Sequence, residues 1–237
     1  NFNLKDKKIW VVGHNGMVGK AIFKKLNKNY DVITVSRKKL DLLSQNSVEK
    51  WMKLNKPEVI FLTAGKVGGI HANSNYPVDF LYQNILIATN IINSAYENNV
   101  KKLVYLGSSC IYPKNSKQPI NEKYLLTGTL EKTNEPYAIA KIAGVKMCEA
   151  YNKQYKTNYL CLMPTNTYGP NDNYHNLNSH FFPALIKKAH ECKIKNKATL
   201  NVWGSGKPLR ELIFVEDIAD ACIFFMNKNT KDHLINI

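Results

Sequence analysis

Three glycines, at positions 13, 16 and 19, stand between an apolar run and a segment with helical spacing. The run from Lys8 to Val12 predicts a buried strand, and apolar residues recur every three or four positions from Met17 to Asn27. A glycine-rich turn between a strand and a helix leaves backbone N–H groups free to bind phosphate. We therefore expect a dinucleotide pyrophosphate to bind at Gly13, His14, Asn15, Gly16, Met17, Val18 and Gly19.

Strand-like and helix-like segments go on alternating along the chain. Further strands are predicted at 32–35, 59–62, 103–106 and 159–163, and further helices at 48–54, 79–97 and 137–156. Such alternation is typical of an α/β protein with a parallel sheet and helices on both faces. The predicted fold class is thus a Rossmann-type doubly wound sheet, which binds its ligands past the carboxyl ends of the strands.

The pattern changes near position 179. We expect residues 1–178 to form the nucleotide-binding domain and residues 179–237 to begin a smaller substrate-binding region. The final segment, 234–237, resembles a strand that is cut without a closing element. The sequence is therefore interpreted as a fragment of a longer protein.

The end of the second predicted strand carries positive charge. Arg37 and Lys38 stand where an enzyme specific for NAD would have a carboxylate to bind the ribose 2′-hydroxyl. A cation at this place suits the 2′-phosphate of NADP, and Arg37 is the better candidate because exposed lysines are common in this chain. Asp41 and Leu42 follow and are expected beside the adenine.

A hydroxyl, a phenol and an ammonium are candidates for catalysis. Ser108 follows an apolar strand, and Tyr137 and Lys141 lie one turn apart on one helix face. A cation near a phenol lowers its pKa toward the working range, so this set can move protons at a carbonyl that receives a hydride. Cys110, close to Ser108, suggests a second proton transfer in the same pocket.

Composition limits the alternatives. The net charge of +15 raises the possibility of nucleic-acid binding, but the positive residues are mostly scattered lysines, which are typical of a solvated surface. The five cysteines show neither close pairs nor metal-ligand spacing, which favours a reduced, cytoplasmic protein without metal. No apolar run is long enough to span a membrane.

Together these motifs resemble the extended short-chain dehydrogenase/reductase superfamily and, within it, the GDP-L-fucose synthase family. The resemblance covers essentially the whole chain and depends on segments 13–19, 66–70, 107–113, 134–144, 163–166, 178–180 and 202–206. It implies NADPH-dependent epimerisation at C3 and C5 and reduction at C4 of GDP-4-keto-6-deoxy-D-mannose. Two departures stand out: Asn15 replaces a frequent arginine that binds the 2′-phosphate, and family members continue beyond Ile237.

The resemblance also implies roles for single residues. It assigns proton transfer at carbon to Cys110 and His180, whose thiol and imidazole have pKa values near neutrality. It implies GDP-sugar contacts at Lys188, Trp203 and Arg210, and a homodimer built on helices 79–97 and 137–156. The further cofactor contacts that it implies are Leu106, Gly107, Ser108, Ser109, Tyr137, Lys141, Pro164, Thr165, Asn166, Thr167 and His180.

Other functions remain open at this point. One alternative is a reductase or C4-epimerase that acts on a different nucleotide sugar, and another is a catalytically silent nucleotide-binding protein. Ser108, Tyr137 and Lys141 argue against the silent protein. On sequence alone, His180 serves equally well as a helix cap.

Overall fold

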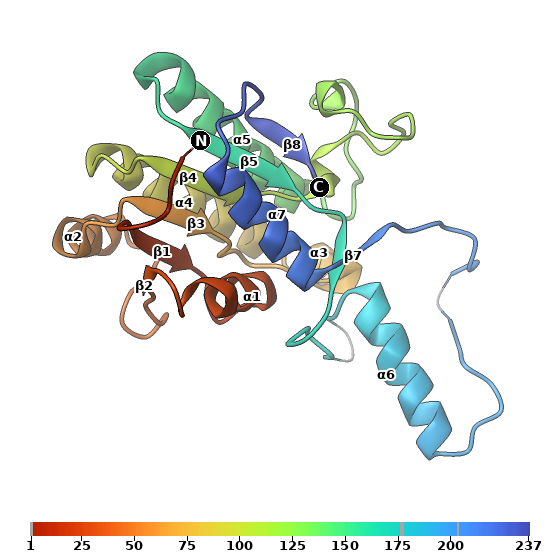
Figure 1. Ribbon diagram of the computed structural model, residues 1–237. Helices are drawn as coiled ribbons and strands as arrows, with labels where there is room; N and C mark the ends of the chain where they lie inside the picture. Colours follow the sequence, from red (N-terminus) through yellow and green to blue (C-terminus); the bar gives the residue numbers. More distant parts are fainter. Residues whose placement is uncertain (1, 176–177, 203) are drawn as a thin grey trace.

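The computed structural model describes residues 2–175, 178–202 and 204–237. Its main sheet has six parallel strands in the order β2-β1-β3-β4-β5-β8 (Figure 1). The strands are β1 (Lys8–Val12), β2 (Asp31–Ile33), β3 (Val59–Leu62), β4 (Lys102–Leu106), β5 (Tyr159–Met163) and β8 (Leu234–Asn236). The predicted parallel α/β sheet is confirmed.

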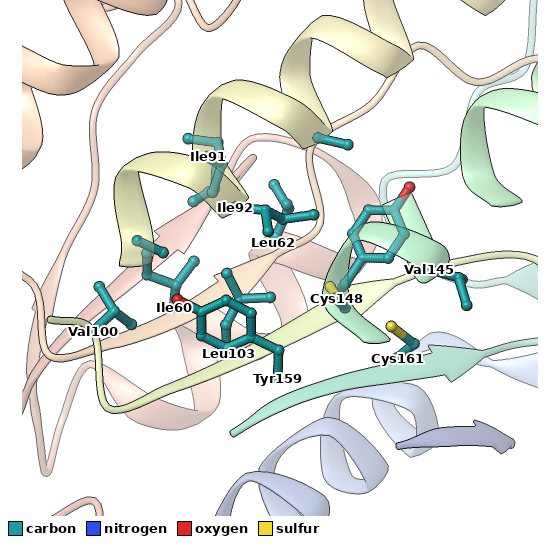
Figure 2. Packing of buried hydrophobic residues seen from close by; sticks show 14 of the residues in the cluster. Ile60, Leu62, Ile91, Ile92, Val100, Leu103, Val145, Cys148, Tyr159 and Cys161 are labelled. Carbon is teal, nitrogen blue, oxygen red and sulfur yellow. The ribbon is translucent and has the colours of Figure 1, made fainter. Parts of the chain in front are cut away.

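Helices cover both faces of this sheet and bury its four central strands, β1, β3, β4 and β5, on both sides. One face carries α2 (Gln45–Asn55), α4 (Pro77–Glu97) and α5 (Glu135–Tyr155), and the other carries α1 (Met17–Leu26) and α7 (Val215–Asn227). Figure 2 shows the first face, where Ile91 and Ile92 of α4 lie over Ile60 and Leu62 of β3. No helix of the described residues is long and apolar enough to cross a membrane.

Short elements interrupt this pattern. They are α3 (Ile70–Asn75), the 3₁₀ turns η1 (Ser109–Ile111) and η2 (Glu122–Tyr124), and a two-stranded parallel sheet of β6 (Asn166–Tyr168) and β7 (Leu212–Phe214). Helix α6 (Phe181–Ile194) projects from the body of the molecule (Figure 1). The sequence analysis did not predict α3 or β6, because three to six residues are too few to show a period.

The residues from 179 onward do not all form one region. Strand β8 pairs with β5 in the main sheet, and α7 buries Ile218, Cys222 and Met226 against it. Helix α6 and the described residues of the loop that follows it extend outward (Figure 1). Residues 179–237 thus contribute both to the projecting α6 segment and, through α7 and β8, to the main sheet.

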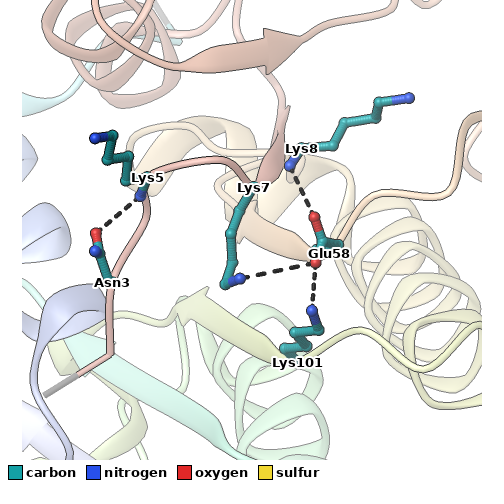
Figure 3. Close-up of polar contacts among 6 residues, drawn as sticks. All are labelled: Asn3, Lys5, Lys7, Lys8, Glu58 and Lys101. Carbon is teal, nitrogen blue, oxygen red and sulfur yellow. Dashed lines mark hydrogen bonds and ion pairs between the residues drawn. The ribbon is translucent and has the colours of Figure 1, made fainter.

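A carboxylate joins three strands at the amino-terminal edge of the sheet (Figure 3). Glu58 precedes β3, and its Oε1 lies 2.5 Å from Lys101 Nζ and 3.8 Å from Lys7 Nζ. Its Oε2 accepts a hydrogen bond of 3.3 Å from the Lys8 N–H. The bond to Lys101 is the main reason that the pKa of Glu58 is lowered. This edge lies opposite the carboxyl ends of the strands, where the cavity is found.

Candidate active site

A cavity of about 1080 Å³ lies at the carboxyl ends of the central strands. The chain leaves β1 for β2 on one side and returns to β3 on the other, and ligands bind where strand order reverses in this way. The predicted site residues that line the cavity are Gly13, His14, Asn15, Gly16, Met17, Val18, Gly19, Arg37, Asp41, Leu42, Leu106, Gly107, Ser108, Ser109, Cys110, Tyr137, Pro164, Thr165, Asn166, Thr167, His180, Lys188 and Arg210. Lys38 and Lys141 do not line it, and Trp203 lies outside the described residues.

The glycine loop is shaped to hold a pyrophosphate. Gly13 has a φ of +91°, and a Cβ there would lie 2.8 Å from the backbone of Ala64. A Cβ on Gly19 would lie 2.2 Å from the Gly13 carbonyl oxygen, so helix and strand approach at a distance that only glycine permits. The N-cap residue of α1 is Gly16, which has no side chain to bond the free N–H groups of the first turn. No acidic residue occupies that turn. The amino end of α1 therefore suits an anion in the cavity.

The adenosine end of the cavity separates the two neighbouring cations. Arg37 and Lys38 are both exposed, but only Arg37 lines the cavity. Asp41 accepts a hydrogen bond of 3.0 Å from the Leu43 N–H, which fixes its carboxylate beside the loop. The geometry therefore fits a 2′-phosphate at Arg37.

Lys141 lies behind the wall of the cavity. It is 4% exposed, and its Nζ donates a hydrogen bond of 2.8 Å to the Leu106 carbonyl. The same Nζ lies 5.8 Å from the centre of the Tyr137 ring. Burial lowers the pKa of Lys141 to about 8, and the Cys110 and Cys161 thiols oppose this change.

Burial also governs Tyr137. It raises the pKa of the phenol, Cys110 raises it further, and a hydrogen bond with Ser108 lowers it. The sequence argument expected Lys141 to lower this pKa. The structure differs because the ammonium lies at the ring and directs its hydrogen bond to a backbone carbonyl. Tyr137 is therefore a proton donor at neutral pH.

The cavity also contains a thiol and an imidazole. Burial raises the pKa of Cys110 to about 11, opposed by the Ser108 hydrogen bond and by Lys141. His180, at the amino end of α6, is exposed and lines the cavity, and the surrounding protein lowers its pKa against the opposing charge of Asp172. At neutral pH the pair therefore offers one protonated thiol and one neutral imidazole.

The last strand holds the loop that follows Cys110. The Asn236 N–H donates to Glu122 Oε1 at 2.9 Å, and its Nδ2 donates to the Ile120 carbonyl at 3.0 Å. Its Oδ1 accepts a hydrogen bond of 2.6 Å from the Tyr112 hydroxyl. Three points of one loop are thus fixed to one residue at the end of β8, one through its backbone N–H and two through its side chain.

The sequence analysis named segment 66–70 among those that carry the resemblance, but it assigned no site role to any residue of the loop after β3. Asn84, buried in α4, accepts from the Lys66 N–H and donates to the Lys66 carbonyl, both at 3.0 Å. A Cβ on Gly65 would lie 2.8 Å from Asn84 Oδ1, so this glycine allows the loop to rest on the helix. Glycines directly after a predicted strand were the available signal.

Comparisons with known proteins agree with this geometry. The family described as NAD dependent epimerase/dehydratase matches residues 9–237. GDP-L-fucose synthase of Sinorhizobium fredii is 51% identical over 235 residues, which are 99% of this chain and 75% of that protein. GDP-L-colitose synthase of Yersinia pseudotuberculosis is 44% identical over 94% of this chain and 73% of its own length.

A solved structure shows the same arrangement. The GDP-L-fucose synthetase of Naegleria fowleri bound to NADP superimposes with a TM-score of 0.89 at 27% identity, covering 100% of this chain and 78% of that one. Likeness in fold, in sequence and in the motifs around the cavity therefore leads to one conclusion. The chain belongs to the NAD dependent epimerase/dehydratase family and, within it, to the GDP-L-fucose synthases.

Proposed function

We propose that this protein converts GDP-4-keto-6-deoxy-D-mannose into GDP-L-fucose, with NADPH as cofactor. The observation that carries the proposal is that one cavity is lined by Ser108, Tyr137, Cys110 and His180. It is lined as well by the glycine loop and Arg37, which suit the pyrophosphate and the 2′-phosphate of the cofactor. The names of the relatives support the choice of a GDP-sugar.

The first part of the reaction takes place at carbon. The C4 ketone acidifies the protons at C3 and C5, and inversion removes a proton from one face of the ring and returns one to the other. Cys110 and His180 carry these transfers, one group accepting the proton and the other donating it. Ser108 and Tyr137 hydrogen-bond the C4 oxygen and stabilise the enolate.

The second part takes place at the C4 carbonyl, where bound NADPH supplies the hydride. Tyr137 donates its proton to the C4 oxygen as that oxygen becomes a hydroxyl. Lys141, with a pKa of about 8, carries a positive charge at neutral pH. This charge, close behind the ring, stabilises the phenolate that remains.

The two parts should separate by mutation. Cys110→Ala should nearly abolish exchange of substrate C–H protons with deuterated solvent and leave NADPH binding intact. Tyr137→Phe should abolish NADPH oxidation yet retain part of the exchange, because Ser108 still polarises the ketone. Nuclear magnetic resonance of the substrate in D₂O and NADPH absorbance measure the two outcomes.

Cys192→Ala is the matched control. This thiol lies on α6 and contacts the Thr199 carbonyl, and it does not line the cavity. The control should exchange deuterium at the wild-type rate. If Cys110→Ala exchanged at that rate as well, the thiol would serve packing alone and the epimerase half of the proposal would be wrong.

A second candidate is an enzyme that acts on another GDP-sugar. The 44% identity to GDP-L-colitose synthase favours this candidate, because the name of that relative gives another product. Product analysis with GDP-4-keto-6-deoxy-D-mannose and NADPH separates the two. GDP-L-fucose formed with equal NADPH consumption supports the first, whereas cofactor binding without turnover supports the second or a silent protein.

We further propose a homodimer in the cytoplasm. Helices α4 and α5 lie side by side: Tyr151 donates a hydrogen bond of 2.6 Å to Asn93, and the rings of Tyr96 and Tyr155 stack at 4.2 Å. Outward-facing apolar residues remain on both helices, with Tyr82 60% and Ile139 43% exposed. Pairing of these helices between two copies would cover them. A cytoplasmic location would keep the Cys110 thiol reduced.

Ile91 and Val145, apolar residues of the same two helices, do not face outward. Ile91 and Val145 are fully buried within their own chain, in the core between the sheet and the two helices (Figure 2). The sequence could not separate these positions from the outward ones, because both helices have apolar residues on more than one face.

A further inference from the structure

Two segments that are far apart in the sequence meet beside His180. Gly69, in the loop after β3, donates a backbone hydrogen bond of 3.0 Å to the Asn178 carbonyl. A Cβ on Gly69 would lie 2.2 Å from the Ser179 carbonyl oxygen and 3.7 Å from the Cα of His180. The φ of Gly69 is −68°, which any residue adopts. This position therefore requires glycine for space and not for conformation.

Asn73 fixes the same loop from its other side. Its Nδ2 donates hydrogen bonds of 2.8 Å to the Gly68 carbonyl and 3.1 Å to the Gly69 carbonyl. The residue is 6% exposed and lines the cavity, and its Oδ1 has no hydrogen-bond partner among the described residues. An unpaired buried acceptor is unfavourable. The amide nitrogen of Asn73 therefore makes the hydrogen bonds that hold the loop.

The amino end of α6 has few other attachments. Pro183 is the one buried residue of this helix, and Phe182 packs its ring against Tyr168 at 5.1 Å. His180 caps the helix without a side-chain hydrogen bond. The position of the imidazole therefore depends on the backbone of residues 178 and 179. This backbone bonds to Gly69 on one side, and its two N–H groups donate to His175 at 3.3 Å each.

We propose that Gly69 and Asn73 are positioning residues, which place His180 for proton transfer at carbon. This inference rests on the proposed function, because it assumes that His180 moves a proton of the sugar. The path runs from the Asn73 amide to the Gly69 peptide and from there to the 178–179 backbone. The role assigned to both residues is to hold this backbone and not to move a proton.

Gly69→Ala tests the close approach directly. Its methyl group would meet the Ser179 carbonyl, so residues 178–180 must move. Solvent exchange of substrate C–H protons should fall roughly 10- to 100-fold, the usual effect of a small displacement of a catalytic group. The Kd for NADPH should stay within about twofold, because the glycine loop and Arg37 are untouched.

Gly68→Ala is the matched control in the same loop. Its Cβ would lie 3.0 Å from Ala72 Cβ and 3.2 Å from Phe80 Cζ, but 3.5 Å from the Asn178 carbonyl, an ordinary contact. It should keep solvent exchange close to the wild-type rate.

The pH profile of exchange gives a second readout for Gly69→Ala. In the wild-type protein the surroundings of His180 lower its pKa. If the variant displaces His180, the limb of the profile that depends on this group should move to higher pH.

Asn73→Asp tests the other contact and covers the case in which Gly69→Ala does not fold. The carboxylate has nearly the same shape, but it cannot donate to the Gly68 and Gly69 carbonyls. Exchange should fall and NADPH binding should remain. Asn75→Asp is the control, because this exposed residue of the same helix donates only to the His71 carbonyl, at 2.7 Å.

The outcomes separate this inference from the proposed function. If the wild-type protein exchanged no proton of GDP-4-keto-6-deoxy-D-mannose, the proposed function would be wrong and this inference with it. If the wild type exchanged and both Gly69→Ala and Asn73→Asp matched its rate and pH profile, the positioning role alone would be overturned. Loss of exchange in both variants, with both controls active, supports it.

Discussion

At the scale of residues, Arg37 and Lys38 show that a shift of one position decides whether a cation reaches the cavity. They are neighbours, carry the same charge and are both exposed, yet only the arginine lines the cavity. A guanidinium also presents a planar set of donors that matches a phosphate better than an ammonium does. The pair therefore provides a test of cofactor choice with a built-in control.

Arg37→Ala should weaken NADPH binding roughly 10- to 100-fold, the range of a lost charge-assisted hydrogen bond. NADH binding should change little, because NADH has no 2′-phosphate. Lys38→Ala should leave both affinities near wild type. Fluorescence titration with the two cofactors measures the difference. Equal losses of NADPH and NADH in Arg37→Ala would remove the argument for phosphate recognition.

Some residues of the site could be predicted from sequence because their signal is local. The glycine loop lies between a strand and a helix, and Tyr137 and Lys141 are one turn apart. Gly69 lies in a segment that carries the resemblance, but no role could be predicted for it or for Asn73, because that role depends on a backbone segment more than a hundred residues later. The direction of the pKa shift of Tyr137 could not be predicted from the sequence either, because burial is its main cause.

At the scale of elements, the strands followed the sequence more closely than their surroundings did. The predicted strand 59–62 has the observed bounds of β3, because four consecutive apolar residues are buried on both faces. The polar residues that join strands at their amino-terminal edge were not predicted. Glu58 is the main example, since its partners come from the segments before β1 and β4 (Figure 3).

Glu58→Gln should lower the free energy of unfolding at pH 7 by a few tenths of a kcal/mol, because water screens this partly exposed ion pair. The pKa of Glu58 is lowered in the folded protein, so its stabilisation is present above the pKa of an unfolded glutamate. It is lost as the pH falls through the folded pKa. Wild type and variant should therefore converge in urea titrations taken to acid pH.

Glu149→Gln is the control for this prediction, since Glu149 pairs with Lys146 on one exposed helix face and joins no strands. Its effect at pH 7 should be smaller. A difference between Glu58→Gln and wild type that persisted unchanged into acid would contradict the assignment to charge.

At the scale of the whole molecule, helices α1 and α7 cover one side of the main sheet, and α4 and α5 cover the other. Exposed apolar side chains remain on both sides: Phe224 on α7, and Tyr82 and Ile139 on α4 and α5. The sequence predicted the helices but not which of their residues face outward. It also did not predict that α7 and β8 return to the sheet, because a long polar stretch separates them from the preceding strands.

Ile139→Glu should convert a dimer into a monomer, because a charge would be buried between the paired helices. Light scattering at micromolar concentration measures the mass. Phe224→Glu is the control: Phe224 is 54% exposed on α7, on the opposite side of the sheet, and its replacement should leave the dimer intact. A monomer mass for the wild-type protein would contradict the proposed interface.

The attachment of Asn236 to the loop after Cys110 affects the order in which this protein can be made. Tyr112 and Asn236 are 124 positions apart, so the loop leaves the ribosome long before Asn236, the residue that holds it, is synthesised. The glycine loop and the first strands can form during synthesis, since nascent chains fold from the amino end. The loop beside the thiol cannot be fastened until residue 236 has emerged. The glycine loop can therefore form well before the loop beside the thiol is fixed in place.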